Sequence, residues 1–159
     1  MPITFKNIIV WRHAEALPVE AVGDDLARPL SAKGQRQAKR MARWLNQHLS
    51  NDLLLLSSPA LRAFQTAEAL KFKINIHPAL QPNAALQEVL DCLSELESQQ
   101  NVLLVGHQPW LGQLVAHLLG FDSAEISIEK GATWWLRQSS TQPSTYKIIS
   151  VQAPSYIPR

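Results

Sequence analysis

The chain has 159 residues, of which 46% are hydrophobic and 18% are charged, and its formal net charge is +2 at pH 7. This length fits one domain, residues 1–159, and a chain of this size buries roughly 70% of the surface that its unfolded form exposes. Acidic and basic residues are interspersed, which excludes the strongly basic face of a nucleic-acid-binding domain, so we expect no nucleic-acid partner. The single cysteine, Cys92, excludes an intramolecular disulfide and a thiolate metal cluster.

The N-terminal segment, residues 1–11, contains one lysine and a short apolar run. It lacks the charged start, the longer apolar stretch and the small-residue cleavage site of a signal peptide. No apolar run approaches the length of about 20 residues that a membrane-spanning helix needs. We therefore expect a cytoplasmic protein without a membrane partner, and we expect it to be a monomer.

Short apolar runs alternate with segments of helical spacing along the chain. Three of the runs are continuous rather than alternating, which is typical of strands that are buried on both faces. Strands that alternate with amphipathic helices predict an α/β fold, here a single three-layer domain with a mostly parallel central sheet flanked by helices. In chain order, we expect a strand at 8–10, a helix at 38–49, a strand at 53–56, a helix at 86–93, a strand at 102–105, a helix at 111–118, and a final hairpin of strands at 132–136 and 146–151.

The residues that follow these buried strands are chemically distinctive. Arg12 and His13 follow the first run, Arg62 comes shortly after the second, and His107 follows the third. Ligands of open α/β sheets bind beyond the carboxyl ends of the strands. Helices are also expected to begin at Pro59 and Pro109, which would turn two positive helix ends toward the same edge of the sheet. This edge is therefore predicted to bind an anion.

The same residues can support phosphoryl transfer. His13 could attack phosphorus through a neutral ring nitrogen. Arg12 and Arg62 offer planar donors that stay charged, and His107 can donate to a phosphate oxygen when it is protonated. Glu15 could orient His13 or bind a cationic leaving group, or it could be a solvated loop carboxylate. Each residue alone also has an ordinary structural explanation, but their joint placement after three strands favours a catalytic site.

Four segments resemble the motifs of one known family. Residues 10–16, Val-Trp-Arg-His-Ala-Glu-Ala, resemble the signature of the histidine phosphatase superfamily, which has a phosphoglycerate mutase-like fold, with Ala14 in place of the usual glycine. Residues 24–34, 57–67 and 105–109 resemble the loop before the first helix, the second arginine motif and the second histidine motif of that family.

The resemblance extends from about residue 8 to about residue 119, and the short chain with its Arg-His-Ala-Glu-Ala sequence looks most like the SixA-type phosphohistidine phosphatases. It implies that His13 is the nucleophile, that Arg12, Arg62 and His107 hold the phosphate, and that no metal or other cofactor is needed.

The sequence also suggests what kind of bond is cleaved. Related phosphomonoesterases and mutases usually carry an acidic residue after the third strand of their own fold. In this chain the region that corresponds is residues 77–87, which contain no carboxylate, and the next carboxylate is Glu88. An alkoxide needs a general acid in order to leave, whereas a phosphorylated imidazole leaves more readily. We therefore expect a phosphatase that acts on the phosphohistidine of a signalling protein, with a phosphorylated histidine phosphotransfer protein as its partner. The alternatives are a phosphomonoesterase for a sugar or nucleotide phosphate and a non-catalytic phosphate-binding module.

Overall fold

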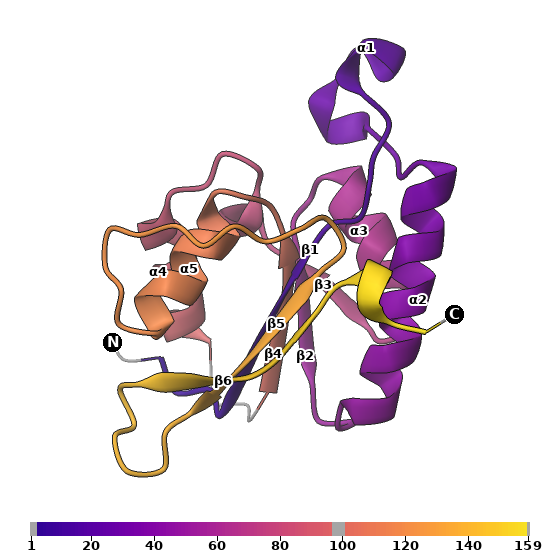
Figure 1. Ribbon diagram of the computed structural model, residues 1–159. Helices are drawn as coiled ribbons and strands as arrows, with labels where there is room; N and C mark the ends of the chain where they lie inside the picture. Colours follow the sequence, from indigo (N-terminus) through magenta and orange to yellow (C-terminus); the bar gives the residue numbers. More distant parts are fainter. Residues whose placement is uncertain (1–2, 97–100, 159) are drawn as a thin grey trace.

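The computed structural model describes residues 3–96 and 101–158 and shows one six-stranded sheet between two layers of helices (Figure 1). The strands are β1 (Asn7–Arg12), β2 (Leu54–Ser57), β3 (Ile74–Ile76), β4 (Asn101–Gly106), β5 (Thr133–Gln138) and β6 (Tyr146–Gln152). The helices are α1 (Val19–Val22), α2 (Ala32–His48), α3 (Leu61–Glu68), α4 (Leu86–Glu95) and α5 (Trp110–Leu118). No helix in the described ranges combines the length and the apolar character that crossing a membrane requires.

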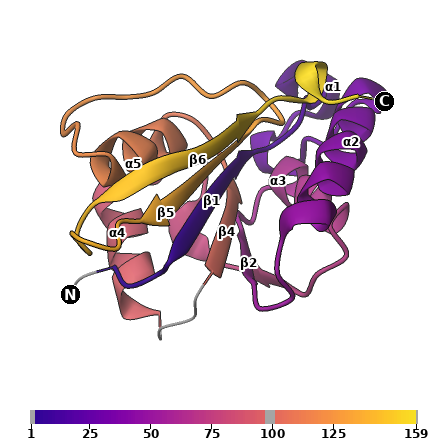
Figure 2. The ribbon, with the colours of Figure 1, turned by 60° about the horizontal axis from the view of Figure 1, so that its bottom comes forward.

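The sheet is mostly parallel, as predicted. Its strand order is β3-β2-β4-β1-β5-β6, which can be followed across Figure 2 from β6 to β2. Strands β1 to β4 run parallel to their neighbours among these four, whereas β5 is antiparallel to β1 and to β6. The predicted α/β fold class and the final hairpin are both confirmed. The short edge strand β3 was not predicted, because its three residues Ile-Asn-Ile form neither a continuous apolar run nor a long alternating one.

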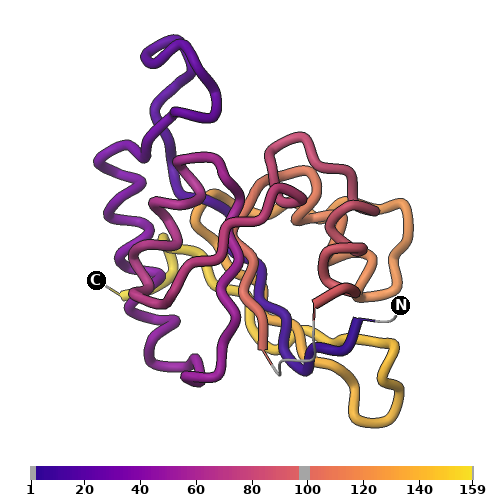
Figure 3. Tube along the Cα trace, turned by 180° about the vertical axis from the view of Figure 1, so that it is seen from behind, coloured from indigo at the N-terminus to yellow at the C-terminus, as the bar shows by residue number. Residues whose placement is uncertain are grey.

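Side chains of β1 alternate between two separate cores. Ile8 and Val10 pack with residues of α4 and α5, whereas Ile9 and Trp11 pack with residues of α2 and α3. The two helical layers lie on opposite sides of the sheet in Figure 1 and again from behind in Figure 3. Burial of each such large apolar side chain contributes about 1.5–3 kcal/mol. These two cores hold the central strands rigidly, and with them the loops that follow their carboxyl ends.

One segment projects from this body. It contains α1 and a short 3₁₀ turn at Asp25–Ala27, and it stands beyond the carboxyl end of β1 in Figures 1 and 3. Neither short element has a buried residue. The turn is capped by Asp24, whose side chain accepts a hydrogen bond from the backbone N–H of Leu26 at 3.1 Å. The projecting segment therefore depends on its polar contacts with the rest of the protein for its position.

Candidate active site

The two predicted histidines meet at the carboxyl ends of adjacent parallel strands. Arg12 is the last residue of β1 and lies opposite Gly106, the last residue of β4, so His13 and His107 each begin a loop at the same level. The backbone N–H of His13 donates to the carbonyl of Gly106 at 3.0 Å. The two imidazole rings are tilted by 50°, and their centroids are 5.1 Å apart. The sheet register thus brings together two residues that are 94 positions apart in the sequence.

Arg62 reaches the same place from helix α3. It is the second residue of the helix, in the first turn as predicted. The two helices begin slightly later than predicted: α3 begins at Leu61, two residues after Pro59, and α5 begins at Trp110, with Pro109 at the capping position. The correction moves each helix start by one or two residues, which is the usual uncertainty of helix ends predicted from sequence.

Arg12, His13, Arg62 and His107 all line one open cavity of about 580 Å³. We call it the carboxyl-end cavity. Its walls also contain Asp25 and Arg28 from the projecting segment, Lys130 from the loop before β5, and Pro82, Asn83, Gln108 and Pro109.

The protonation state of His13 suits a nucleophile. Its Nδ1 lies 2.7 Å from the carbonyl oxygen of Ala14, and because a carbonyl can only accept, Nδ1 carries the hydrogen. The lone pair is then on Nε2. Burial is the largest of the causes that lower the pKa of His13 to about 3; the charges of Arg62, Arg12 and Lys130 act in the same direction, and the Ala14 hydrogen bond opposes them. The ring is therefore neutral at pH 7, with an unprotonated nitrogen available for attack.

His107 is also neutral in the free protein. Burial is the main cause that lowers its pKa to about 2, and His13, Arg62 and Arg12 add to it, whereas Asp25 raises it. Its Nε2 lies 2.7 Å from the Ser58 hydroxyl, which itself accepts a hydrogen bond from the N–H of Ala60. When Ser58 donates to Nε2, the ring hydrogen is on Nδ1. This nitrogen is buried and has no partner among the described residues, so a neutral His107 can already donate to a bound oxyanion.

Each guanidinium is held by its outer nitrogens and keeps its Nε free. Nη1 of Arg12 donates to the carbonyl of Ile128 at 2.8 Å, and Nη1 of Arg62 donates to the carbonyl of Asp25 at 2.8 Å. The Nε atoms of both arginines are buried and have no hydrogen-bond partner within the part of the chain that the structure describes. Buried donors without partners are rare in folded proteins, because each one costs about 1–3 kcal/mol. Together with Nδ1 of His107, they form a set of donors suited to the oxygens of a phosphoryl group.

The side chain of Glu15 contacts the start of helix α2. It does not line the carboxyl-end cavity. Its carboxylate accepts a hydrogen bond from the Ser31 hydroxyl at 2.6 Å, and Ser31 caps helix α2 by accepting from the N–H of Gly34 at 3.0 Å. A Cβ on Gly34 would lie only 1.9 Å from the carbonyl oxygen of Glu15, so this position requires glycine. The structure thus shows Glu15 fastening α2 to the loop after the nucleophile.

Several residues of the site were not found from the sequence. Asp25 and Arg28 fall within the 24–34 motif, so the resemblance offered a signal for them. No strand ends immediately before them, however, so the rule that ligands bind beyond strand ends did not indicate them. Lys130 lies in a loop without a recognisable pattern. Thr66, within the 57–67 motif, accepts from the N–H of Ala14 at 3.0 Å and donates to the carbonyl of Arg62 at 2.7 Å. It therefore ties the loop after the nucleophile to the helix that carries the second arginine.

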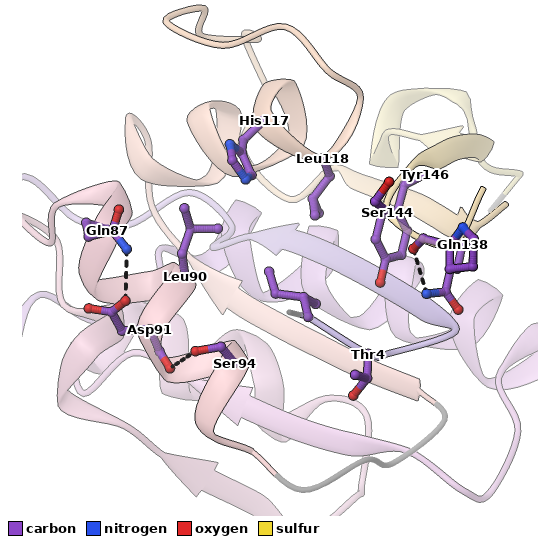
Figure 4. Close-up of a pocket in the computed structure, with 12 residues that line it drawn as sticks. Thr4, Gln87, Leu90, Asp91, Ser94, His117, Leu118, Gln138, Ser144 and Tyr146 are labelled. Atoms are coloured by element: carbon purple, nitrogen blue, oxygen red, sulfur yellow. Dashed lines mark hydrogen bonds between the residues drawn. The ribbon is translucent and has the colours of Figure 1, made fainter. Parts of the chain in front are cut away.

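A second and larger hollow, of about 720 Å³, lies at the other end of the sheet. We call it the amino-end hollow. Some of its polar groups are paired with one another, as Figure 4 shows: Gln87 donates to Asp91 at 2.8 Å, and Ser94 donates to the carbonyl of Asp91 at 2.9 Å. Its lining residues are Ile3, Thr4, Gln87, Leu90, Asp91, Ser94, His117, Leu118, Gln138, Pro143, Ser144 and Tyr146. Its described lining residues include neither an arginine nor a lysine, the donors that line the carboxyl-end cavity. In residues 3–96 and 101–158, no group of three or more His, Cys, Asp or Glu side chains is placed to hold a metal ion.

Comparison with known proteins agrees with this geometry. The sequence profile of the histidine phosphatase superfamily (branch 1) matches residues 8–89. The phosphohistidine phosphatase SixA homolog of Haemophilus influenzae is 33% identical over 129 residues, which cover 72% of this chain and 77% of that protein. A solved structure of the protein histidine phosphatase SixA complexed with tungstate has a TM-score of 0.81 at 25% identity and covers 94% of this chain and 97% of its own. The alpha-ribazole phosphatase of Shigella flexneri has a TM-score of 0.72 at 19% identity, covering 93% and 96% of the two chains, and shares the fold alone.

Proposed function

We propose that this chain, which belongs to branch 1 of the histidine phosphatase superfamily, removes the phosphoryl group from the phosphohistidine of a signalling protein. The chain is a SixA-like phosphatase of that superfamily. The observation that carries the proposal is the set of neutral and cationic nitrogens at the carboxyl-end cavity: a neutral His13 of fixed tautomer lines the same cavity as Arg12, Arg62 and His107, each of which has a buried nitrogen without a partner among the described residues.

The reaction has two steps in this proposal. Nε2 of His13 attacks phosphorus, the P–N bond of the substrate breaks, and its electron pair stays on the departing imidazole. Water then attacks the phosphorylated His13, which releases inorganic phosphate and restores the neutral ring. Nδ1 of His13 keeps its hydrogen bond to the carbonyl of Ala14 throughout, so the nucleophilic nitrogen keeps its direction.

The three buried donors act on the oxygens of the transferring group. Arg12, Arg62 and His107 all line one cavity, and each has a buried nitrogen whose interactions with charge are stronger than they would be in bulk water. Because the outer nitrogens of both arginines are already fixed by carbonyls, little reorganisation is needed when negative charge develops. These residues thus supply electrostatic stabilisation without moving a proton.

The site lacks a neutral carboxyl group that could protonate an alkoxide. Asp25 is the one carboxylate among the described residues that line the cavity. Partial burial raises its pKa, but hydrogen bonds and charges from Arg28 and Arg62 outweigh this effect and lower the pKa below its ordinary value. An ionised Asp25 cannot act as a general acid at neutral pH. This favours a substrate whose leaving group departs without such help, which supports P–N over P–O cleavage.

The surroundings of the cavity favour a protein substrate. The projecting segment carries Leu17, Val19, Val22 and Leu26, whose exposed fractions range from 38% to 50%. The same segment contributes Asp25 and Arg28 to the cavity wall. A group of exposed apolar side chains beside a reactive site is typical of a protein-binding surface. The proposed partner is therefore a phosphorylated histidine phosphotransfer protein that contacts this segment, and the enzyme is a cytoplasmic monomer that needs no metal.

One substrate series tests the proposed function. The measurement is kcat/KM at a single pH for a phosphohistidine protein, phosphoramidate, an aryl phosphate, phosphoserine and a sugar phosphate. We expect the P–N substrates to react faster than phosphoserine and the sugar phosphate by roughly 10²–10⁴-fold, the usual contribution of the missing general acid. The aryl phosphate should lie between them. If phosphoserine or a sugar phosphate reacts as fast as phosphohistidine, the chain is a phosphomonoesterase, and if nothing is turned over, it is a phosphate-binding module.

A further inference from the structure

The carboxyl-end cavity contains one negative group whose position is unusual for an anion site. Asp25 belongs to the 3₁₀ turn of the projecting segment and is 49% exposed. One carboxylate oxygen lies 3.0 Å from Nη1 of Arg28, and the other lies 3.2 Å from Nη2 of Arg62. A carboxylate offers about four acceptor positions, and these two contacts use about half of them. Asp25 thus retains acceptor capacity at the cavity wall.

All the other charged side chains that line this cavity are cationic. Arg28 and Arg62 contact the Asp25 carboxylate directly, and Arg12 and Lys130 line the same cavity. The remaining titratable groups there are His13 and His107, both neutral at pH 7 because burial lowers their pKa values to about 3 and about 2. A carboxylate beside a phosphate pocket weakens phosphate binding by repulsion. Its retention at this position is explained if it binds another part of the substrate, one that carries an N–H group.

A phosphorylated imidazole has such a part. Phosphorus is bonded to one ring nitrogen, and the other nitrogen can be protonated. If it is protonated, breakage of the P–N bond leaves its electron pair on a ring that departs as neutral imidazole. If it is not, the same step must release an imidazolate anion, which is a much poorer leaving group. The proton on the distant ring nitrogen therefore replaces the general acid that the cavity lacks.

We propose that the Asp25 carboxylate accepts a hydrogen bond from the distant ring N–H of the substrate phosphoimidazole and holds that ring protonated while the P–N bond breaks. The inference rests on the proposed function, because it requires a phosphohistidine substrate. The bound ring loses no proton to Asp25, so atoms and charge balance: a cationic phosphoimidazole becomes a neutral imidazole as the phosphoryl group passes to Nε2 of His13. Asp25 is in this view a catalytic residue that selects the leaving group.

The test compares Asp25→Asn with Asp24→Asn. The control removes the same charge one residue earlier, at a side chain that caps the 3₁₀ turn, a role that asparagine also fills, and that does not line the cavity. The measurement is kcat/KM from pH 5.5 to 8.5 for a phosphohistidine protein and for p-nitrophenyl phosphate, whose leaving group has no N–H.

For phosphohistidine, the wild type should lose activity only as the bound ring deprotonates at alkaline pH. In Asp25→Asn, this decline should begin about one pH unit lower, which gives an approximately tenfold loss at pH 8.5 and little loss at pH 5.5. Any effect on p-nitrophenyl phosphate arises from the contact of Asp25 with Arg62, so it should be the same at every pH in this range. Asp24→Asn should match the wild type, and Asp25→Glu should recover part of the alkaline activity.

Other results would overturn the inference. An equal loss for both substrates at every pH would show that Asp25 only positions Arg62, and an unchanged profile would show that it does not contact the leaving group. A wild-type protein that does not hydrolyse phosphohistidine would instead refute the proposed function, before any variant is compared. Circular dichroism should show that Asp25→Asn is folded, as expected for a turn without buried residues.

Discussion

The two ends of the sheet carry hollows of opposite character. The amino-end hollow is larger, about 720 Å³ against about 580 Å³, but the side-chain amide and hydroxyl groups of Gln87 and Ser94 on its wall already have partners within the fold. The carboxyl-end cavity is smaller, and among the described residues three of its buried nitrogens, at Arg12, Arg62 and His107, have no partner. Unsatisfied buried donors cost stability, so a fold keeps them where a ligand satisfies them. The pairing of buried donors, rather than volume, therefore distinguishes the carboxyl-end cavity as the candidate site.

Replacement of one histidine at each end of the sheet tests this difference between the two hollows most directly. His13→Ala should lower turnover of a phosphohistidine protein by a factor on the order of 10⁴ or more, because it deletes the nucleophile. His117→Ala is the matched control, since His117 lies at the amino-end hollow, where it contacts Asp122 at 3.1 Å. This control should keep wild-type turnover. Near-normal activity in a folded His13→Ala protein would show that another residue is the nucleophile.

A matched pair of arginine substitutions tests the same difference between the two ends of the sheet. Arg62→Lys keeps the positive charge but loses the planar donor set, so kcat should fall by roughly 10²–10³, the usual effect of removing one transition-state donor. Inhibition by orthovanadate should weaken as well, because it mimics the transferring group. Arg137→Lys, at the opposite end of the sheet where Arg137 donates to Asn7 at 3.0 Å, should leave both measurements unchanged. Equal effects of the two variants would contradict the assignment of the phosphate pocket.

The sequence could predict those parts of this arrangement that depend on strand ends. Continuous apolar runs indicated burial on both faces, and β1 indeed contributes Ile8 and Ile9 to two different cores. Once β1 and β4 are adjacent and parallel, His13 and His107 must lie close together, so their pairing followed from order along the chain. The location of Arg62 in a first helical turn followed from the proline before it.

The rest of the site depends on long-range loop contacts that leave no local pattern. Lys130 reaches the cavity because its loop is held to β1, where the indole N–H of Trp11 donates to the carbonyl of Gly131 at 3.0 Å. Asp25 lines the cavity because its backbone and carboxylate both contact Arg62, 37 positions away. Glu15, two residues after His13, was predicted either to act at His13 or the leaving group or to be a solvated loop carboxylate; in the structure its carboxylate accepts a hydrogen bond from Ser31. Sequence spacing does not specify such contacts.

A third prediction concerns stability against pH. The folded-state pKa values of His13 and His107 lie at about 3 and about 2, well below the ordinary value of 6.5, chiefly because both rings are buried. Between pH 6.5 and these values the unfolded chain binds more protons than the folded one, so the free energy of unfolding falls as the pH falls. Each histidine contributes a slope of at most about 1.4 kcal/mol per pH unit.

Urea unfolding between pH 6.5 and 5 measures this slope. Replacement of either cavity histidine, as in His13→Gln or His107→Gln, should reduce the loss over this interval by up to about 2 kcal/mol. If both variants keep the wild-type slope, the two rings are not held neutral by the fold.

The smallest expected effect comes from a residue that acts through His107. Ser58 is fully buried, and its hydroxyl lies 2.7 Å from Nε2 of His107. In Ser58→Ala, nothing fixes the hydrogen of His107 on Nδ1, so part of the protein presents a lone pair to the phosphate instead of a donor. We expect kcat for a phosphohistidine protein to fall about tenfold, comparable to the loss of one hydrogen bond worth about 1.4 kcal/mol, with a smaller change in KM.

Ser94→Ala, which removes a hydroxyl from the amino-end hollow, is the matched control for Ser58→Ala. A merely structural Ser58, which also accepts from the N–H of Ala60, would lower the melting temperature in Ser58→Ala without changing kcat. A lower kcat at an unchanged pH optimum, with the control at wild-type rate, would therefore identify Ser58 as the group that sets the tautomer of His107.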